Sequence, residues 1–139
     1  MVHEDLKPCS QVLEKAFGQA PHNETFVLGN AEQYLTKKFS YCGESSYVAE
    51  GEDGKILGFA IYNVSVWANG PQAILEEIAV DPEVHHMGIG RALMEFGNKQ
   101  LNDLGIEAMM LWVRKDPRLI DFYQKQGFQV SDEYIAMFK

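Results

Sequence analysis

The sequence predicts an α/β fold in which a mixed β-sheet is flanked by helices, and three observations support this prediction. Residues 74–80 read ILEEIAV, an apolar and β-branched run that is typical of a strand. The next segment carries Gly88 and Gly90, and from Ile89 the apolar residues recur at roughly helical spacing. The remaining chain alternates short strand patterns with helical ones. Its 139 residues suit one domain, residues 1–139, with one sizeable core.

Two helices are predicted before the first strand. Pro8 lies near the start of the first, residues 8–17, and Gly18 follows its end. Asn30 is expected to cap the second, residues 30–39. Four aromatic residues of this region could line a binding site, although such residues more often belong to a core: Phe26, Tyr34, Phe39 and Tyr41. Trp67 and Trp112 are likewise expected to pack rather than to stack on a ligand.

The strands are predicted from β-type runs separated by turn residues. Residues 47–50 and 55–66 form two strands joined through Glu52-Asp53-Gly54, and Asn69-Gly70 leads into the central strand at residue 72. A further strand covers residues 108–113 and a helix covers residues 117–126. Residues 128–130 and 134–138 are expected to close the sheet as a hairpin.

The turn at Gly88-Ile89-Gly90 favours binding of a phosphate or pyrophosphate. Two glycines let the backbone approach a ligand closely, and the first amides of the following helix point outward without partners. A dinucleotide fingerprint would need a third glycine where Leu93 stands, and the chain has no Gly-Lys-Ser/Thr of a Walker loop. A strand-glycine-helix turn can also be only a tight connection.

These residues resemble the GNAT superfamily of N-acetyltransferases, whose acetyl-CoA signature reads Q/R-x-x-G-x-G/A and opens a helix after a strand. Here the strand ends Ile78-Ala79-Val80, and the turn reads HHMGIG over residues 85–90. A second family block, N-x-x-A-x-x-F-Y followed by Gly-Phe, resembles DPRLIDFY over residues 116–123 and Gly127-Phe128. The order APHNETF (residues 20–26), LEEIAV and MFK also resembles the branch that includes aminoglycoside 6′-N-acetyltransferases.

The resemblance implies acetyl-CoA as co-substrate and no metal. It implies that Asp116, Tyr123 and the residues of the strand end and the turn bind acetyl-CoA, namely Ile78, Ala79, Val80, His85, His86, Met87, Gly88, Ile89, Gly90 and Arg91. The chain departs from the family pattern at His85, Asp116 and Leu119. Backbone amides do not depend on side-chain identity, so phosphate binding is expected to survive, whereas a side-chain contact from Asp116 stays open.

The family usually begins with a strand, for which residues 1–4 are too few. That strand is either lacking, or its pairing is borrowed from a neighbouring copy. An unpaired sheet edge favours a homodimer.

The activity that the resemblance implies is transfer of an acetyl group from acetyl-CoA to a primary amine, by direct attack in a ternary complex. The acceptor is a small-molecule or peptidyl amine. Tyr123 matches the family tyrosine near the CoA sulfur, and a phenol with a pKa near ~10 suits protonation of the leaving thiolate. The alternative is a catalytically inactive module that binds acyl-CoA as a sensor or partner protein.

Two glutamates are candidates for the general base, with Glu77 favoured by resemblance over Glu76. Neighbouring strand residues face opposite sides, so one carboxylate would point into the acceptor cleft and the other away from it. Both could instead bind a cationic substrate by charge or simply be solvated.

Composition narrows the class of partner. A net charge of −8 argues against nucleic acid, and it suits either a cationic acceptor or solubility alone. No apolar run of about 18 residues and no signal peptide are present, so a cytoplasmic location without membrane insertion is expected. Cys9 and Cys42 lack metal or disulfide spacing, and the adjacent histidines lack a third ligand for zinc.

Overall fold

The computed structural model describes residues 1–139 as one α/β unit. Its helices are α1 Leu6–Phe17, α2 Asn30–Cys42, α3 Ile89–Asp103 and α4 Pro117–Lys125. Its strands are β1 Ser46–Glu50, β2 Ile56–Trp67, β3 Gly70–Val80 and β4 Ala108–Leu111. Short 3₁₀ turns cover His3–Asp5, Gly43–Ser45 and Pro82–Val84. Every predicted helix is confirmed, although Gly29 and not Asn30 caps α2, with a left-handed backbone at φ 81°.

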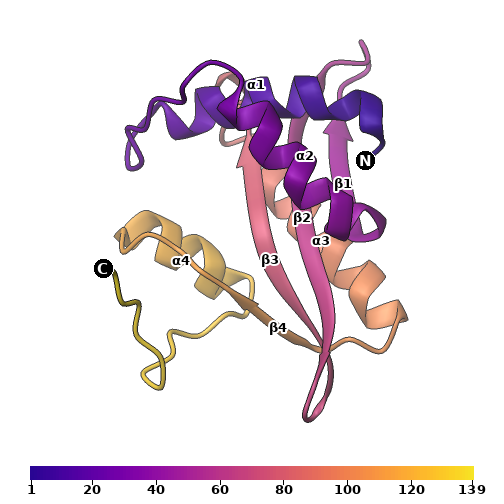
Figure 1. The fold of residues 1–139 in the computed structure, drawn as a ribbon, viewed down its shortest axis with the longest axis vertical. Helices are drawn as coiled ribbons and strands as arrows, with labels where there is room; N and C mark the ends of the chain where they lie inside the picture. The colour runs from indigo at the N-terminus through magenta and orange to yellow at the C-terminus, as the bar shows by residue number, and fades with distance from the viewer.

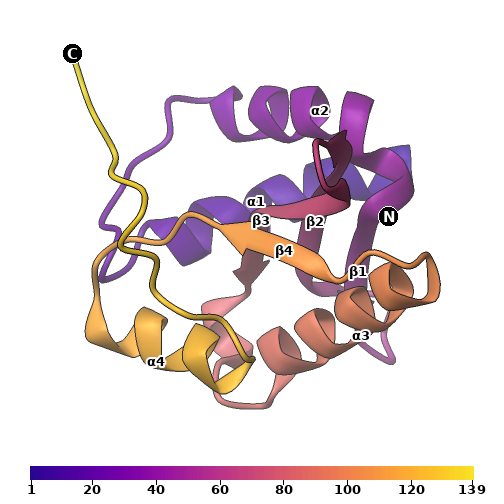
Figure 2. The same cartoon turned by 90° about the horizontal axis from the view of Figure 1, so that it is seen from below.

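The four strands form one mixed sheet in the order β1-β2-β3-β4 (Figure 1). The first three are antiparallel, and β4 runs parallel to β3 after the crossover through α3. Helices α1 and α2 lie on one face of the sheet, whereas α3 and α4 lie on the other (Figure 2). The predicted fold class is therefore confirmed. None of the helices combines the length and apolar composition that crossing a membrane requires.

A buried cluster fills each face of the sheet. The face under α1 and α2 is built around Leu13, Leu35, Phe59 and Ile61. The face under α3 is built around four other buried side chains: Tyr62, Leu93, Met94 and Leu101. Burying one such side chain contributes about 1.5–3 kcal/mol relative to leaving it in water, so the two clusters hold the sheet rigidly between its helices.

Helix α3 approaches β2 closely because Gly97 has no side chain. A Cβ at this position would lie 2.4 Å from the hydroxyl and 2.5 Å from a ring carbon of Tyr62. The Tyr62 ring is fully buried in this gap, and its hydroxyl contacts the sulfur of Met94 at 3.7 Å. Gly97 thus sets the distance between α3 and the sheet.

Strands β3 and β4 diverge halfway along β3. Their pairing runs from Gln72 opposite Ala108 to Leu75 opposite Leu111 and ends there. Residues 76–80 of β3 continue with β2 on one side and no strand on the other. The sheet therefore opens into a wedge, with β3 as one wall and the segment after β4 as the other (Figure 1).

A β-bulge lies where the wedge begins, and it corrects the predicted orientation of the two glutamates. Ile61 pairs with Glu77 and Tyr62 with Leu75, so Glu76 is an extra residue in the ladder. The extra residue lets Glu76 and Glu77 both reach side chains of α2. The prediction that they point to opposite faces assumed a regular strand, whereas a bulge places two residues opposite one.

The chain start has no strand, as the sequence suggested. Residues 3–5 form a 3₁₀ turn, and the N-terminal ammonium of Met1 donates to the carbonyl of Ser46 at 2.8 Å. The outer edge of β1 is therefore the edge of the sheet.

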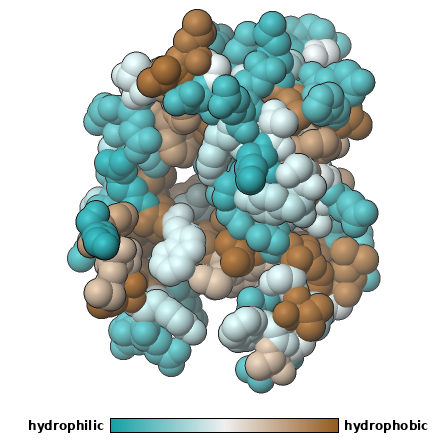
Figure 3. Space-filling view, viewed as in Figure 1, coloured by the Kyte–Doolittle hydropathy of each residue, from teal (hydrophilic) through white to brown (hydrophobic).

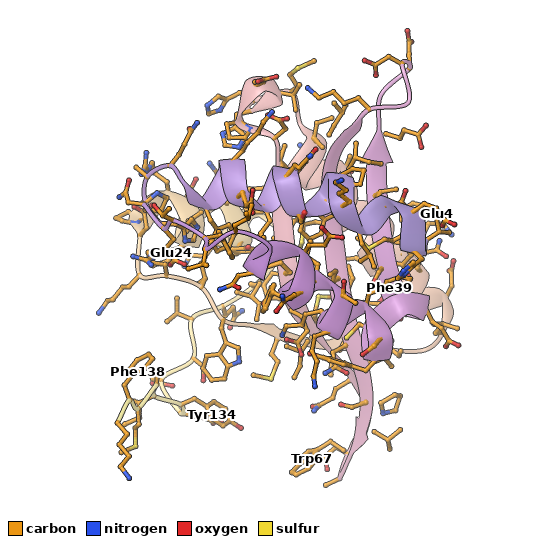
Figure 4. All side chains as sticks on the ribbon, turned by 45° about the horizontal axis from the view of Figure 1, so that its top comes forward. Glu4, Glu24, Phe39, Trp67, Tyr134 and Phe138 are labelled. Atoms are coloured by element: carbon orange, nitrogen blue, oxygen red, sulfur yellow. The ribbon has the colours of Figure 1, made fainter.

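The prediction of two closing strands at residues 128–130 and 134–138 is wrong. These residues belong to no strand. Phe128 packs against the α3-side core, but the later apolar side chains are exposed, up to 95% for Phe138. Figure 4 shows Tyr134 and Phe138 on a tail that runs away from the sheet. The alternating pattern was suited to a strand, but a strand also needs a neighbour with which to pair, and β4 is only four residues long.

Candidate active site

The loop between β3 and α3 presents a row of backbone N–H groups. Gly88 caps α3 with a left-handed backbone at φ 81°, and the first amide to bond within the helix is that of Ala92, which donates to Gly88 at 2.9 Å. The amides of residues 86–91 have no backbone partner. His86 also has a positive φ of 66°. The amides and the helix dipole together form a geometry that suits a pyrophosphate.

A buried carboxylate fixes the start of this loop. Asp81 directly follows β3 and is only 1% exposed. Its carboxylate accepts hydrogen bonds from Lys15 at 3.0 Å and from the amide of Glu83 at 3.0 Å, and its own amide donates to Leu57 at 2.8 Å. Burial alone would raise the pKa of Asp81, but these donors outweigh burial and the pKa is lowered. The loop is thereby tied to α1 and β2.

Two histidines complete the loop without a metal-like arrangement. The Nε2 atom of His85 lies 3.1 Å from the carbonyl of Val80, and the rings of His85 and His86 stand nearly perpendicular at 6.2 Å. The side chain of His85 thus turns back to the strand end, while both side chains are exposed beside the free amides.

Glu77 lies at the open wall of the wedge, where its surroundings shift the pKa of its carboxyl group. The hydroxyl of Tyr34 on α2 donates to its Oε2 at 2.8 Å. Burial raises the pKa of Glu77 to about 7, although the hydrogen bond from Tyr34 and the charge of Lys38 act in the opposite direction. A carboxyl group with this pKa changes protonation state near neutral pH, as a general base requires.

Glu76 has the opposite environment. It forms an ion pair with Lys38 of α2, and its Oε1 accepts from the amide of Asn63 at 2.9 Å. Burial alone would raise the pKa of Glu76, but Lys38 and Asn63 lower it, so the group stays ionised at neutral pH. The two adjacent glutamates thus differ in protonation: Glu77 can titrate near neutral pH, whereas Glu76 is ionised and paired with Lys38.

Sequence reasoning missed Lys38 and Asn63 and left Tyr34 only as a candidate wall residue. Tyr34 and Lys38 are four residues apart on α2, and the Lys38 ammonium lies 5.4 Å from the centre of the Tyr34 ring. Their i,i+4 spacing on the polar side of a predicted helix was the sequence signal that the two side chains lie together. No sequence signal pointed to Asn63, because its contact with Glu76 depends on the register of the bulged strands.

Tyr123 lies on α4, with its ring against Phe122 at 5.1 Å and Phe128 at 5.9 Å between centroids. Burial raises its pKa to about 12, and the charge of Glu77 adds to the shift. The Tyr123 phenol therefore stays protonated at neutral pH. Phe122 packs into the α3-side core with Ile78 and Val80.

Asp116 acts as the N-terminal cap of α4. Its carboxylate accepts from the amides of Arg118 at 2.9 Å and Leu119 at 3.3 Å, and Pro117 occupies the first helical position. The side-chain oxygen of the Asn in the family pattern could accept hydrogen bonds from the same amides. Asp116 therefore departs from the pattern but preserves the N-terminal cap of α4.

The two tryptophans do not pack as predicted, since Trp67 is 71% and Trp112 is 65% exposed. The two cysteines are buried and free. Burial raises the pKa of Cys9 to about 12 and that of Cys42 to about 11, so neither is a reactive thiolate.

The comparisons with known proteins agree with this geometry. The family model of the acetyltransferase (GNAT) family matches residues 6–128, and the chain therefore belongs to this family. A mycothiol acetyltransferase of Paenarthrobacter aurescens is 36% identical over 117 residues, which are 81% of this chain and 36% of that protein. The chain thus spans little more than a third of that relative.

A second relative is the ribosomal protein bS18-alanine N-acetyltransferase of Escherichia coli, 29% identical over 125 residues, or 89% of this chain and 74% of that protein. Among solved structures, an aminoglycoside acetyltransferase from an uncultured soil metagenomic sample superposes with a TM-score of 0.75. That match covers 100% of this chain and 91% of the other at 22% identity, which supports the fold.

Proposed function

We propose that residues 1–139 act as one acetyltransferase domain, which transfers an acetyl group from acetyl-CoA to a primary amine by direct attack in a ternary complex. The observation that carries this proposal is the wedge between β3 and β4. It places free backbone amides at one end and a carboxyl group with a pKa of about 7 in its wall.

Two parts of the chain contact different parts of one acetyl-CoA molecule. The amides of residues 86–91 receive the pyrophosphate at the start of α3. The unpaired edge of β3 at residues 76–80, including Ile78, Ala79 and Val80, pairs with the amide groups of the pantetheine arm like an added strand. This support is geometric and needs no side chain at the positions where the chain departs from the family pattern.

Glu77 and Tyr123 supply the proton transfers. Glu77 takes a proton from the acceptor ammonium, and the free amine attacks the thioester carbonyl carbon. An N–H of the open β3 edge stabilises the negative charge that develops on the carbonyl oxygen. Tyr123 protonates the thiolate that leaves as the carbon–sulfur bond breaks, a role that its raised pKa permits because the phenol is protonated at neutral pH.

Calorimetric titration with acetyl-CoA, with CoA and with NADH tests the binding step. Micromolar binding of acetyl-CoA without NADH binding is expected, and Gly88→Val should weaken it, because Val disfavours the left-handed backbone by roughly 1–2 kcal/mol. Amine-dependent release of thiol from acetyl-CoA then tests transfer. Binding without turnover would identify a sensor module instead, and an absence of acetyl-CoA binding would contradict the proposal.

A further inference from the structure

Part of the sheet face that carries Glu77 has no helix over it. Ala73 and Leu75 of β3 and Met109 of β4 pack into the α3-side core. Because strand side chains alternate, Ile74 and Met110 between them point to the opposite face. These two residues pair with one another across β3 and β4, and neither belongs to a buried cluster.

Trp112 extends this surface along the other wall of the wedge. It directly follows Leu111, the last residue of β4, which packs into the α3-side core, and we infer that continued alternation puts Trp112 on the same side as Met110. It is 65% exposed. We call Ile74, Met110 and Trp112 the apolar shelf. Figure 3 shows the surface hollowed in this part of the molecule, with apolar side chains gathered along the hollow.

The shelf adjoins the group that we propose as the base. Leu75 and Leu111 are the last paired residues, so the bulge with Glu76 and Glu77 begins directly beyond Leu75, which follows Ile74. On the facing wall, Trp112 is the first residue after Leu111, where the pairing with β3 ends. An amine that reaches Glu77 from the α2 side therefore has the rest of its molecule on or beside the shelf.

The carboxylates around this approach are already neutralised by partners. Glu76 is paired with Lys38, and Glu24 of the α1–α2 loop is paired with Arg114 at 2.8 Å. The Glu24–Arg114 pair also joins the α1–α2 loop to the segment that carries Trp112. Neither Glu76 nor Glu24 is therefore free to pair with a second ammonium group on the acceptor.

We propose that the acceptor is a monoamine on an apolar carrier and that the apolar shelf binds the carrier. This inference rests on the proposed acetyl transfer and adds the class of acceptor to it. A polyamine or another polycation would have to leave a charged group on Ile74, Met110 and Trp112, and an unpaired charge on an apolar surface is unfavourable.

A matched pair of amines tests the charge requirement. In n-hexylamine and cadaverine the number of heavy atoms is the same, but cadaverine has a second ammonium group where hexylamine ends in a methyl group. We expect kcat/KM for hexylamine to exceed that for cadaverine by roughly tenfold or more, and ethylamine, which cannot reach the shelf, to fall below hexylamine by a similar factor. Thiol release from acetyl-CoA measures all three.

Two tryptophan variants test the place of binding. Trp112→Ala should lower kcat/KM for hexylamine by roughly tenfold while leaving ethylamine and the KM for acetyl-CoA almost unchanged. Trp67→Ala is the matched control, because Trp67 is similarly exposed but lies at the tip of the β2–β3 hairpin (Figure 4). It should change none of these values.

Lys38→Met tests the role of the neutralised carboxylate. Removing Lys38 leaves Glu76 free to pair with a second ammonium, so the ratio of kcat/KM for cadaverine to that for hexylamine should rise. The ratio is the readout, because any general loss of activity affects both amines equally.

The outcomes separate this inference from the function on which it rests. Acetylation of cadaverine at least as efficient as that of hexylamine would support acetyl transfer and overturn the apolar acceptor. A Trp112→Ala variant that loses thermal stability and slows both long and short amines equally would mean that the chain's own tail covers the shelf, which also overturns the inference. An absence of thiol release with every amine would contradict the proposed function itself.

Discussion

The two ends of β3 show how one strand can serve both the core and the chemistry. Residues 72–75 have a strand on each side, and Ala73 and Leu75 are buried under α3. The second half of β3, residues 76–80, has β2 on one side only. The paired half fixes the position of the strand, and the unpaired half offers backbone groups and carboxylates to a ligand. The site is therefore held by a rigid element and not by a mobile loop.

The same contrast separates the two glutamates at the boundary. Glu76 forms an ion pair with Lys38 and a hydrogen bond with Asn63, and its pKa is lowered. Glu77 has one hydroxyl donor, Tyr34, and a pKa of about 7. Burial acts on both groups, but only Glu76 has a cation to offset it directly. Neighbouring residues of the same type thus acquire different chemistry from their partners.

The largest expected effect comes from removing the titrating carboxyl group at the open end. Glu77→Gln keeps the size of the side chain and a hydrogen-bond partner for Tyr34, but it cannot accept the ammonium proton. We expect kcat to fall by about 10²–10⁴-fold, the usual contribution of a general base, with little change in the KM for acetyl-CoA. Steady-state thiol release measures both values.

Glu76→Gln is the matched control at the neighbouring position. It removes the ion pair with Lys38, so a modest change in kcat, within about tenfold, is expected. Equal losses in the Glu76 and Glu77 variants would mean that the bulge acts as a structural unit and that no single carboxylate is the base.

Tyr123→Phe tests the facing side of the wedge and should have the second largest effect. The ring keeps its contacts with Phe122 and Phe128, while the proton for the leaving thiolate is lost. We expect kcat to fall by about a hundredfold, at the low end of the range for a general acid, with acetyl-CoA binding nearly intact by calorimetry. Unchanged turnover would remove Tyr123 from the mechanism.

Gly97→Ala tests the paired end and should affect stability instead of chemistry. The added Cβ would overlap Tyr62, which pairs with Leu75 where the rigid half of β3 ends. We expect a loss of about 1–3 kcal/mol in the free energy of unfolding, measured by urea denaturation. Tyr62→Leu should recover part of that loss in the double variant. A double variant in which the two losses simply add would show that the contact with Tyr62 is not the cause.

Much of this architecture could be predicted from the sequence because its determinants are local. The strand pattern ILEEIAV, the glycines at residues 88 and 90 and the helical spacing after Ile89 each lie within a few residues of one another, and the structure has the strand, loop and helix in that order. The lack of a strand at residues 1–4 followed from length alone.

The sequence-based predictions that were wrong concern features that depend on residues distant in the sequence. The bulge at Glu76 exists only in register with β2, so alternation within β3 could not indicate that both glutamates face α2. The pattern at residues 134–138 is suited to a strand, but no strand lies beside it. The partners Lys38 and Asn63 come from two other elements, and their effect on Glu76 appears only when α2, β2 and β3 are assembled.

The pH dependence of kcat in the wild-type chain and in Glu77→Gln tests the central claim most directly. Because burial raises the pKa of Glu77, the basic form that accepts the proton accumulates only as pH rises through about 7. With saturating acetyl-CoA and hexylamine, kcat for the wild type should therefore increase with pH and level off above about pH 8, and the variant should be slow and flat over the same range. A rising limb that persists unchanged in Glu77→Gln would show that another group takes the proton and would contradict the role of the open end of β3.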